Sequence, residues 1–241
     1  MYITDTLRIE DLSLVHEPTS TLILGDTHIG EEEALTHQGV LVPQFAFKDL
    51  YRRTHEILTT GAYQTVVVNG DVKHNFGRIS DDEWDNVYTY VELLRSHAEV
   101  RIIRGNHDSM LDPLTDDAKV TVTDHIRLDD VAICHGHKEV DEVSLGDVQT
   151  RILGHEQPAI GLRDGERTEH FKAFGSGDLD GTTVILMPSM NQLREGSNLL
   201  QEQLLSPYLD EFDLKSAEVI LIGEDREPRR FGTLGSLQAN R

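Results

Sequence analysis

The sequence is nearly free of cysteine and contains no long hydrophobic run. The single cysteine, Cys134, excludes an internal disulfide and a cysteine-rich zinc site. No run approaches the roughly 18 apolar residues that a membrane-spanning helix needs. The charged residues Asp5, Arg8, Glu10 and Asp11 interrupt the N-terminus, which therefore does not look like a secretory signal. We expect a cytoplasmic protein that does not insert into a membrane.

Lysine is also scarce, and the charge is strongly one-sided. The 241 residues include 43 acidic and 22 basic side chains, for a formal net charge of -21, and only 6 of the basic residues are lysine. An acidic surface keeps a chain soluble through self-repulsion. An acidic, lysine-poor composition is also expected of a halophilic protein adapted to molar salt, and we favour that interpretation. The acidic surface would then reflect adaptation to high salt and would not exclude a nucleic-acid substrate.

The chain shows no internal repeat and no low-complexity linker, so we predict a single domain over residues 1–241. Its core is expected to span about 21–222, followed by a loose tail at 223–241, and the segment 196–214 is expected to add a helix. Short β-branched runs bounded by Gly, Asp or Asn indicate buried strands. These runs are 22–24, 66–68, 102–103, 131–133, 152–153, 184–186 and 219–222.

Two segments between the early runs have helical periodicity. Apolar side chains within 81–96 share one helical face, and Ser80 and Glu83 fit a capping box. A second helix is predicted from about Gln44 to Thr59, with Pro43 near its start. The N-terminal half therefore alternates strands and helices, which favours a parallel sheet. In the C-terminal half the strands follow one another closely, which favours a second, mixed or antiparallel sheet.

Polar side chains suited to metal binding follow five of the predicted strands. The five strand ends read GDTH (25–28), GDVKH (70–74), GNHD (105–108), HGH (135–137) and GH (154–155). Ligands of open α/β sheets bind beyond the carboxyl ends of the strands, so ends that share an edge, or two facing edges, would bring these residues together. Carboxylate, amide oxygen and imidazole are ligands for Mn, Fe, Zn or Ni.

The order of these five elements resembles that of the calcineurin-like metallophosphoesterase family. The resemblance covers roughly residues 21–160, and the fold it implies extends to about 222. The stretches GDTHIGEEEALTHQGVLVP and NGDVKHNFG are most similar to the archaeal SbcD-related phosphoesterases and to bacterial phosphoesterases associated with DNA ligase and helicase. The implied fold is α/β, a four-layer α/β/β/α sandwich with two central mixed β-sheets.

The resemblance also implies a dinuclear metal centre whose two divalent ions share a carboxylate and a hydroxide that attacks phosphorus. The first ion would be held by Asp26 and His28, the second by Asn106, His135 and His155, and Asp71 would bridge them. Mn2+ is the favoured ion, with Zn2+, Fe2+, Ni2+ and Mg2+ as alternatives.

Further roles follow for residues near the implied ions. His107 would contact the phosphate and protonate the leaving alkoxide. Asp108 would either orient His107 or serve as an ordinary turn residue. We also name three candidate substrate-binding residues, His74, His137 and Arg104. His74 fits the resemblance and would reach the substrate or the surroundings of the ligands. The alternatives are a hydrogen bond across the turn for His137 and an ordinary exposed cation at a strand end for Arg104.

One position departs from the family pattern, Gly-His-x-His, whose second histidine completes the first metal site. Here Gly154 and His155 are followed by Glu156 and Gln157. A glutamine offers a neutral and weaker oxygen ligand. Gln157 would bind the first ion through that oxygen, favouring Mn2+ or Mg2+ over Zn2+, or leave the position to water, or make the site mononuclear with reduced activity. We favour the first two, because every other element is present.

The leading functional interpretation is a metal-dependent phosphohydrolase, of phosphodiesterase or nuclease type, acting on nucleic acid or a nucleotide. A link to DNA repair, a helicase or ligase partner and a homodimer would follow by analogy only. No aromatic-basic stacking patch is visible in the sequence. The alternatives are a phosphomonoesterase acting on a protein or metabolite, and a catalytically weak scaffold, for which Gln157 is the only support.

Overall fold

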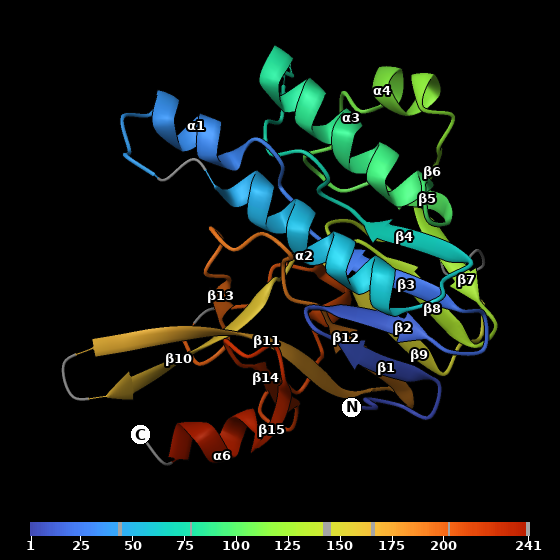
Figure 1. Cartoon of the computed structure of the whole chain (residues 1–241). Coiled ribbons are helices and arrows are strands. Elements are labelled where there is room, and N and C mark those ends of the chain that lie inside the picture. The colour runs from blue at the N-terminus through green and yellow to red at the C-terminus, as the bar shows by residue number, and fades with distance from the viewer. Residues whose placement is uncertain (43–44, 78, 142–145, 165–166, 202, 240–241) are drawn as a thin grey trace.

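Two β-sheets lie at the centre of the computed structural model, which describes residues 1–42, 45–77, 79–141, 146–164, 167–201 and 203–239 (Figure 1). The first sheet contains, in spatial order, β1 (Leu7–Glu10), β2 (Ser13–His16), β3 (Thr21–Gly25), β4 (Thr65–Asn69), β5 (Glu99–Ile103) and β6 (Thr121–Thr123). Strands β3 to β6 run parallel, and β1 and β2 extend one edge in antiparallel fashion.

The second sheet mixes parallel and antiparallel pairs. Its main path is β13 (Ser197–Asn198), β10 (Pro158–Asp164), β11 (Arg167–Leu179), β12 (Thr182–Leu186), β9 (Thr150–Leu153), β8 (Val131–Cys134) and β7 (His125–Leu128). Strand β14 (Glu218–Ile222) pairs with β11, and β15 (Pro228–Thr233) pairs with β14. Neighbours β8, β9 and β12 are parallel, so their carboxyl ends reach one edge of the sheet.

Helices cover the outer faces of the two sheets, and the prediction of an α/β/β/α sandwich is confirmed. The helices of the N-terminal half are α1 (Glu31–His37), α2 (Ala46–Thr60), α3 (Asp81–Arg95) and α4 (Asp112–Asp117), and α2 and α3 pack on the first sheet (Figure 1). The fourth layer is thin. It consists of the 3-10 turn η1 (Pro207–Leu209), which packs against β8, β9 and β12, and α6 (Leu234–Ala239), which packs against β11 and β14.

The main hydrophobic core lies between the sheets and draws on both of them. Ile23 and Val67 of the first sheet and Ile133 and Ile152 of the second belong to one buried cluster. Strands that are buried on both faces read as continuous apolar runs rather than as alternating ones. For this reason all seven runs predicted from the sequence are confirmed as strands.

The structure differs from the sequence predictions at several places. The predicted helix over 196–214 is wrong, because the described part of this segment forms only β13 and η1, and its apolar side chains pack into separate clusters. Pro43 and Gln44, at the predicted start of the second helix, lie outside the described residues. Beyond Gly223, where we expected a loose tail, the chain forms β15 and α6. Among the described helices, none is both long and apolar enough to cross a membrane.

Candidate metal centre

Five strand ends from the two sheets meet at one place. In the first sheet, Asp26 and His28 follow β3, Asp71 follows β4 and Asn106 follows β5. In the second sheet, His135 follows β8 and His155 follows β9. The ligand atoms of Asp26, His28 and Asp71 lie within 4.8 Å of one another, and so do those of Asp71, His135 and His155. The sequence prediction that these residues gather at the strand ends is therefore reproduced, with Asp71 common to both groups.

The backbone turns sharply where the strands end. Asp26, His28, Asp71, His155 and Gln157 all have positive φ, between 42° and 61°. Residues other than glycine rarely adopt this left-handed backbone conformation. Each such residue costs about 1 to 3 kcal/mol, and clusters of them are found at functional sites. The fold thus holds five candidate ligands in conformations that local propensity would avoid.

Two glycines allow the strand ends to approach closely. A Cβ atom on Gly70, whose φ is 79°, would collide with the His135 ring, and one on Gly105 would collide with Asp71. These collisions explain why glycine precedes the candidate ligands in the GDVKH and GNHD elements.

The Asp71 carboxylate occupies the middle of the site. Its Oδ2 atom lies 3.6 Å from His28 Nε2, 3.4 Å from His135 Nε2 and 3.9 Å from His107 Nε2, and its Oδ1 atom accepts a hydrogen bond from the His107 backbone at 2.9 Å. Burial raises the pKa of Asp71, but the hydrogen bond and charge of His135 lower it by more, so the pKa is below its usual range. Asp71 is therefore a buried carboxylate shared by three imidazoles.

On the β3 side, Gln157 lies between the two candidate ligands of the first ion. Its Nε2 atom donates to Asp26 Oδ1 at 3.0 Å and lies 2.7 Å from His28 Nε2. Asp26 Oδ2 is buried without a hydrogen-bond partner, and burial raises the pKa of Asp26 to about 7. Rotating the amide by half a turn would place its oxygen, instead of its nitrogen, toward Asp26 and His28.

On the other side, His135 is held in a defined orientation. Its Nδ1 atom lies 3.0 Å from the Asn69 carbonyl oxygen, so Nδ1 carries a proton that it donates to this carbonyl. Its Nε2 atom then faces Asn106 Oδ1, at 3.2 Å, and Asp71. Burial lowers the pKa of His135, but Asp71 and Asp26 raise it by more, to about 9.

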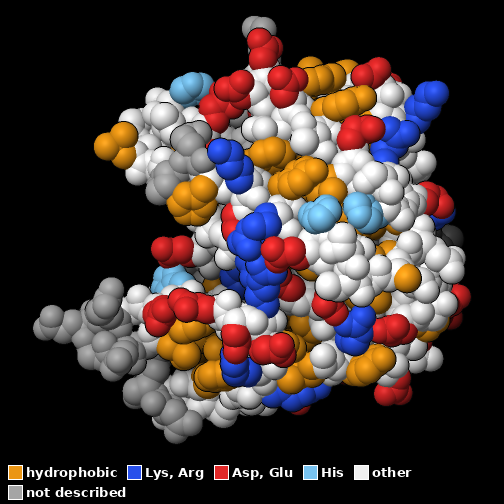
Figure 2. Space-filling view, viewed as in Figure 1, with side chains coloured by type: hydrophobic (Ala, Val, Ile, Leu, Met, Phe, Trp, Pro, Cys, Tyr) orange, Lys and Arg blue, Asp and Glu red, His pale blue; other side chains and the backbone are white. Residues whose placement is uncertain are grey.

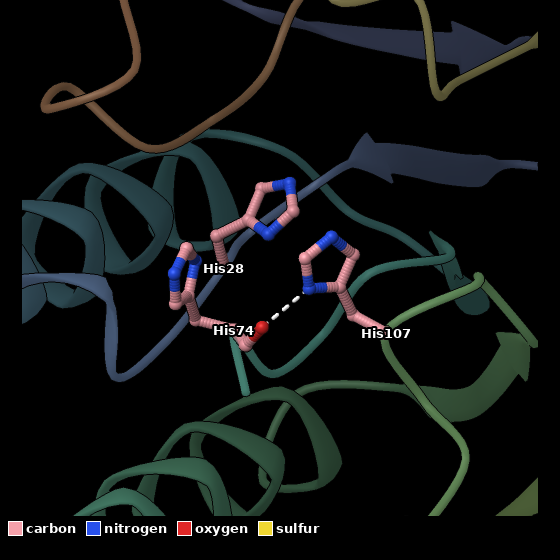
Figure 3. Close-up of side chains that lie close together, drawn as sticks. All are labelled: His28, His74 and His107. Atoms are coloured by element: carbon pink, nitrogen blue, oxygen red, sulfur yellow. Dashed lines mark hydrogen bonds between the residues drawn. The ribbon is translucent and has the colours of Figure 1, made fainter. Parts of the chain in front are cut away.

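The His107 ring stands at the front of the site with His28 and His74 (Figure 3). Its Nδ1 atom donates to the His74 carbonyl oxygen, which leaves Nε2 directed toward Asp71. The exposed Phe76 ring stacks on it, with the ring centroids 3.7 Å apart. His107 is thus oriented by a backbone carbonyl on one edge and an aromatic ring on one face.

A cavity of about 420 Å³ gives access to this cluster, which we call the catalytic cavity. It is lined by Asp71, Asn106, His107, His155 and Gln157 from the strand ends. The model of the calcineurin-like phosphoesterase family matches residues 19–223. The chain belongs to the calcineurin-like phosphoesterase family. It is a metallophosphoesterase, a hydrolase that acts on phosphoric ester bonds, and the family typically binds divalent metal ions.

Solved structures of similar fold include the nuclease MPE of Pseudomonas putida. It is 17% identical, 88% of each chain is covered, and the TM-score is 0.62. A structure of Vps29 from Entamoeba histolytica in complex with zinc is 16% identical, with 88% of this chain and 98% of that chain covered and a TM-score of 0.39. A predicted phosphoesterase of Streptococcus pneumoniae is 12% identical, with 88% of this chain and 96% of that chain covered and a TM-score of 0.34. The comparison with curated proteins gives no match.

Two residues predicted to act in this metallophosphoesterase are placed elsewhere. The Asp108 carboxylate accepts hydrogen bonds from the backbone of Val72 at 3.0 Å and of Gly105 at 2.9 Å, so it braces two strand ends and does not orient the His107 ring. The Arg104 guanidinium donates to the Asp108 carbonyl at 2.9 Å and pairs with Asp112, outside the catalytic cavity. The turn role of Asp108 is therefore favoured, and Arg104 is not placed to bind substrate.

The other two candidates lie beside the centre. The His137 ring is 5.2 Å from the His135 ring and 6.2 Å from the His155 ring, and burial lowers its pKa to about 4. The His74 ring is 5.7 Å from that of His28 and 5.6 Å from that of His107. Both remain candidates for contact with substrate.

Sequence reasoning missed the segment that follows β12. Ser189 Oγ donates to the Asp26 carbonyl at 2.7 Å, and Asn191 Nδ2 donates to the His28 carbonyl at 3.3 Å. Arg194, in the same segment, lines the catalytic cavity. The available signal was that Ser189 and Asn191 stand three and five residues after the run at 184–186, so the end of this strand belongs with the other five.

Proposed function

We propose that this metallophosphoesterase is a phosphodiesterase of nuclease type that uses two divalent ions, with Mn2+ preferred. The observation that supports it best is the position of Asp71, a buried carboxylate with one group of candidate ligands on each side. Asp26, His28 and Asp71, with Gln157, would hold the first ion. Asp71, Asn106, His135 and His155 would hold the second.

The residues present fit divalent cations. Asp26 Oδ2 is buried and unpaired, which is costly unless a cation or a water completes its environment. The donor set consists of carboxylate, amide and imidazole, and a neutral amide oxygen from Gln157 suits Mn2+ or Mg2+ better than Zn2+. When bound, the ions would supply Lewis acidity, which lowers the pKa of water and offsets charge on the phosphoryl oxygens.

His107 is placed to handle the proton of the leaving group. With Nδ1 donating to the His74 carbonyl, Nε2 is the nitrogen that faces the catalytic cavity. Burial lowers the pKa of His107, and an approaching anion such as the substrate phosphate would favour its protonated form. The protonated Nε2 would then donate to the leaving oxygen.

With the charge of bound ions set aside, the side chains of the cavity would repel a monoester more than a diester. Three acidic residues, Glu31, Asp71 and Glu195, line it, against one arginine, Arg194. A phosphodiester carries one negative charge, whereas a monoester carries close to two at neutral pH. The nuclease of Pseudomonas putida shows that this fold can carry such an activity. Membership of the SbcD-related or ligase-associated group, a role in DNA repair, a helicase or ligase partner and a homodimer rest on motif resemblance and belong to the proposal.

The test is hydrolysis of bis-p-nitrophenyl phosphate with Mn2+ in molar KCl, a salt chosen for the acidic, lysine-poor surface. Wild type should turn over the diester only with metal, and faster than p-nitrophenyl phosphate. Faster cleavage of the monoester would favour the phosphomonoesterase alternative. Complete inactivity of folded, Mn2+-supplied protein toward both esters would refute the hydrolytic proposal.

A second candidate function is a catalytically weak scaffold. One observation favours it: the Gln157 amide already bridges Asp26 and His28, so the first half of the centre is held together without a cation. A scaffold would bind its partner equally well in EDTA and after replacement of His107 by alanine. Metal-dependent turnover would exclude the scaffold function.

A further inference from the structure

Arg194 lies where two cavities meet. A second cavity, of about 410 Å³, adjoins the catalytic cavity, and the two share Arg194 and Glu195. Lys and Arg side chains gather beside the hollow in the middle of the face shown in Figure 2. Within the described part of the chain, Arg194 is the only Lys or Arg that lines the catalytic cavity itself. An anion entering that cavity therefore meets one protein cation.

An ion pair with Glu31 lies on one side of the Arg194 guanidinium. Its Nε atom lies 3.0 Å from Glu31 Oε1, and Glu31 Oε2 in turn accepts a hydrogen bond from Asn191 at 2.9 Å. The Arg194 side chain is 28% exposed and that of Glu31 is 12% exposed. A guanidinium has five N–H donors in a planar fork, so an ion pair through Nε leaves the terminal amino groups able to bind a second partner.

One terminal amino group points toward the histidine cluster. An Arg194 terminal nitrogen lies 3.4 Å from His74 Nδ1. Since arginine can only donate, Nδ1 is the acceptor, and the neutral His74 ring carries its proton on Nε2. Arg194 thus donates to one edge of the His74 ring and leaves the Nε2 proton for another acceptor.

We propose that Arg194 binds a non-bridging oxygen of the substrate phosphate, with Glu31 holding the guanidinium in place. This inference rests on the proposed function and deepens it. Arginine matches the oxygens of a phosphate through paired N–H donors, and lysine does so only as a point charge. In a cavity lined by Glu31, Asp71 and Glu195, one oriented cation offsets repulsion that the substrate would otherwise meet.

A purely structural role is the competing explanation. Arg194 would then only tie the segment after β12 to α1 through Glu31. Such a role predicts lower thermal stability on replacement and unchanged affinity for phosphate. Phosphate affinity therefore separates the two roles, whereas a loss of activity alone would not.

The experiment compares wild type, Arg194→Met, Arg194→Lys and Arg226→Met. Arg226 is a matched control, because it lines only the second cavity, is 31% exposed against 28%, and pairs with Glu56 at 2.6 Å. Binding of inorganic phosphate to protein supplied with Mn2+ is measured by calorimetry, and KM and kcat are measured with bis-p-nitrophenyl phosphate. Bound Mn2+ and the melting temperature are recorded for each variant.

Arg194→Met should weaken phosphate binding and raise KM by about 10- to 100-fold, the range for hydrogen bonds to a charged group, with unchanged Mn2+ content. Arg194→Lys should retain part of the affinity, and Arg226→Met should resemble wild type. Wild-type phosphate affinity in Arg194→Met, or an equal loss in Arg226→Met, would overturn the proposal. If Arg194→Met fails to fold, Arg194→Lys decides by the same criterion.

The two proposals fail in distinguishable ways. Wild type that binds phosphate through Arg194 but cleaves neither nitrophenyl ester would contradict the phosphodiesterase proposal and leave the Arg194 contact intact. Wild type that cleaves the diester, with the same KM and phosphate affinity after replacement of Arg194, would contradict the Arg194 contact and support the phosphodiesterase proposal.

Discussion

The two halves of the candidate centre differ in how their ligands are held. In the half formed by β5, β8 and β9, the Asn69 carbonyl fixes the proton of His135 on Nδ1 and leaves Nε2 facing the site. In the half formed by β3, the Gln157 amide lies 3.0 Å from Asp26 and 2.7 Å from His28, where a cation would be needed. One half is arranged to receive an ion, and the other is already satisfied in part by a neutral side chain.

This contrast indicates that one substitution, glutamine for histidine at position 157, can make the two ion sites differ in affinity while the remaining ligands stay in place. The amide donates to the Asp26 carboxylate, so it lowers the cost of leaving the first ion out. A first ion must turn or displace this amide before it binds. We therefore expect the second ion to bind more tightly than the first.

Asp71→Asn should have the largest effect, because Asp71 belongs to both halves. Its loss should weaken both ions, and turnover should fall by at least about 10⁴-fold, since each ion contributes several kcal/mol of charge stabilisation. Elemental analysis of bound Mn2+ and hydrolysis of bis-p-nitrophenyl phosphate are the measurements. Two tightly bound ions in Asp71→Asn would contradict the central position of this carboxylate.

His107→Ala should lower kcat by about 10²-fold while Mn2+ content stays at the wild-type level. His107 faces the cavity but is not needed to hold either half together. The loss should be greater for a diester with an alkyl leaving group than for one with nitrophenolate, because the poorer leaving group needs a proton more. An equal loss with both leaving groups would argue against proton donation.

Gln157→His should change metal binding more than turnover. An imidazole in place of the amide should tighten the first ion by about 10- to 100-fold, so that titration calorimetry resolves two comparable sites instead of two unequal ones. Gln157→Ala, which lacks both amide and imidazole, is the control, and its first ion should bind more weakly than that of Gln157→His. Equal affinities for two ions in wild type would show that the asymmetry is absent.

Arg104→Ala should have the smallest effect. Its guanidinium binds the Asp108 carbonyl and Asp112 and does not line the catalytic cavity. The stability cost of a partly exposed ion pair is up to about 1 kcal/mol, and kcat and KM should stay within about twofold of wild type. A clear rise in KM on replacement of Arg104 would instead support its role in substrate binding.

The sequence was sufficient where a feature depends on residues that are close along the chain. Each of the seven predicted strands contains a short apolar run, and the candidate ligands stand within a few residues after such a run, as Asp71 follows Gly70 after β4. Polar or long strands such as β11 and β15 carry no such run and were not predicted. Parallel pairing then carries these ends to one edge, which sequence order alone suggests.

The remaining features depend on distant contacts. The Asp108 carboxylate binds the backbone N–H of Gly105 nearby, but it also binds that of Val72, 36 residues away. Ser189 binds a carbonyl 163 residues away. These two long-range contacts have no local signature. The predicted helix over 196–214 failed for a similar reason, because its leucines serve separate clusters set by the second sheet. Arg194 was missed because only the completed fold places it beside His74.

The left-handed backbone at the strand ends has a consequence for laboratory evolution. At Asp26 and His155, for example, φ is positive, and glycine would relieve the strain at the cost of the side chain. Selection of random variants for heat resistance alone should therefore enrich glycine at these positions and yield robust but inert proteins. Selection for thermostability in this fold has to be paired with a screen for turnover, or it will remove the chemistry first.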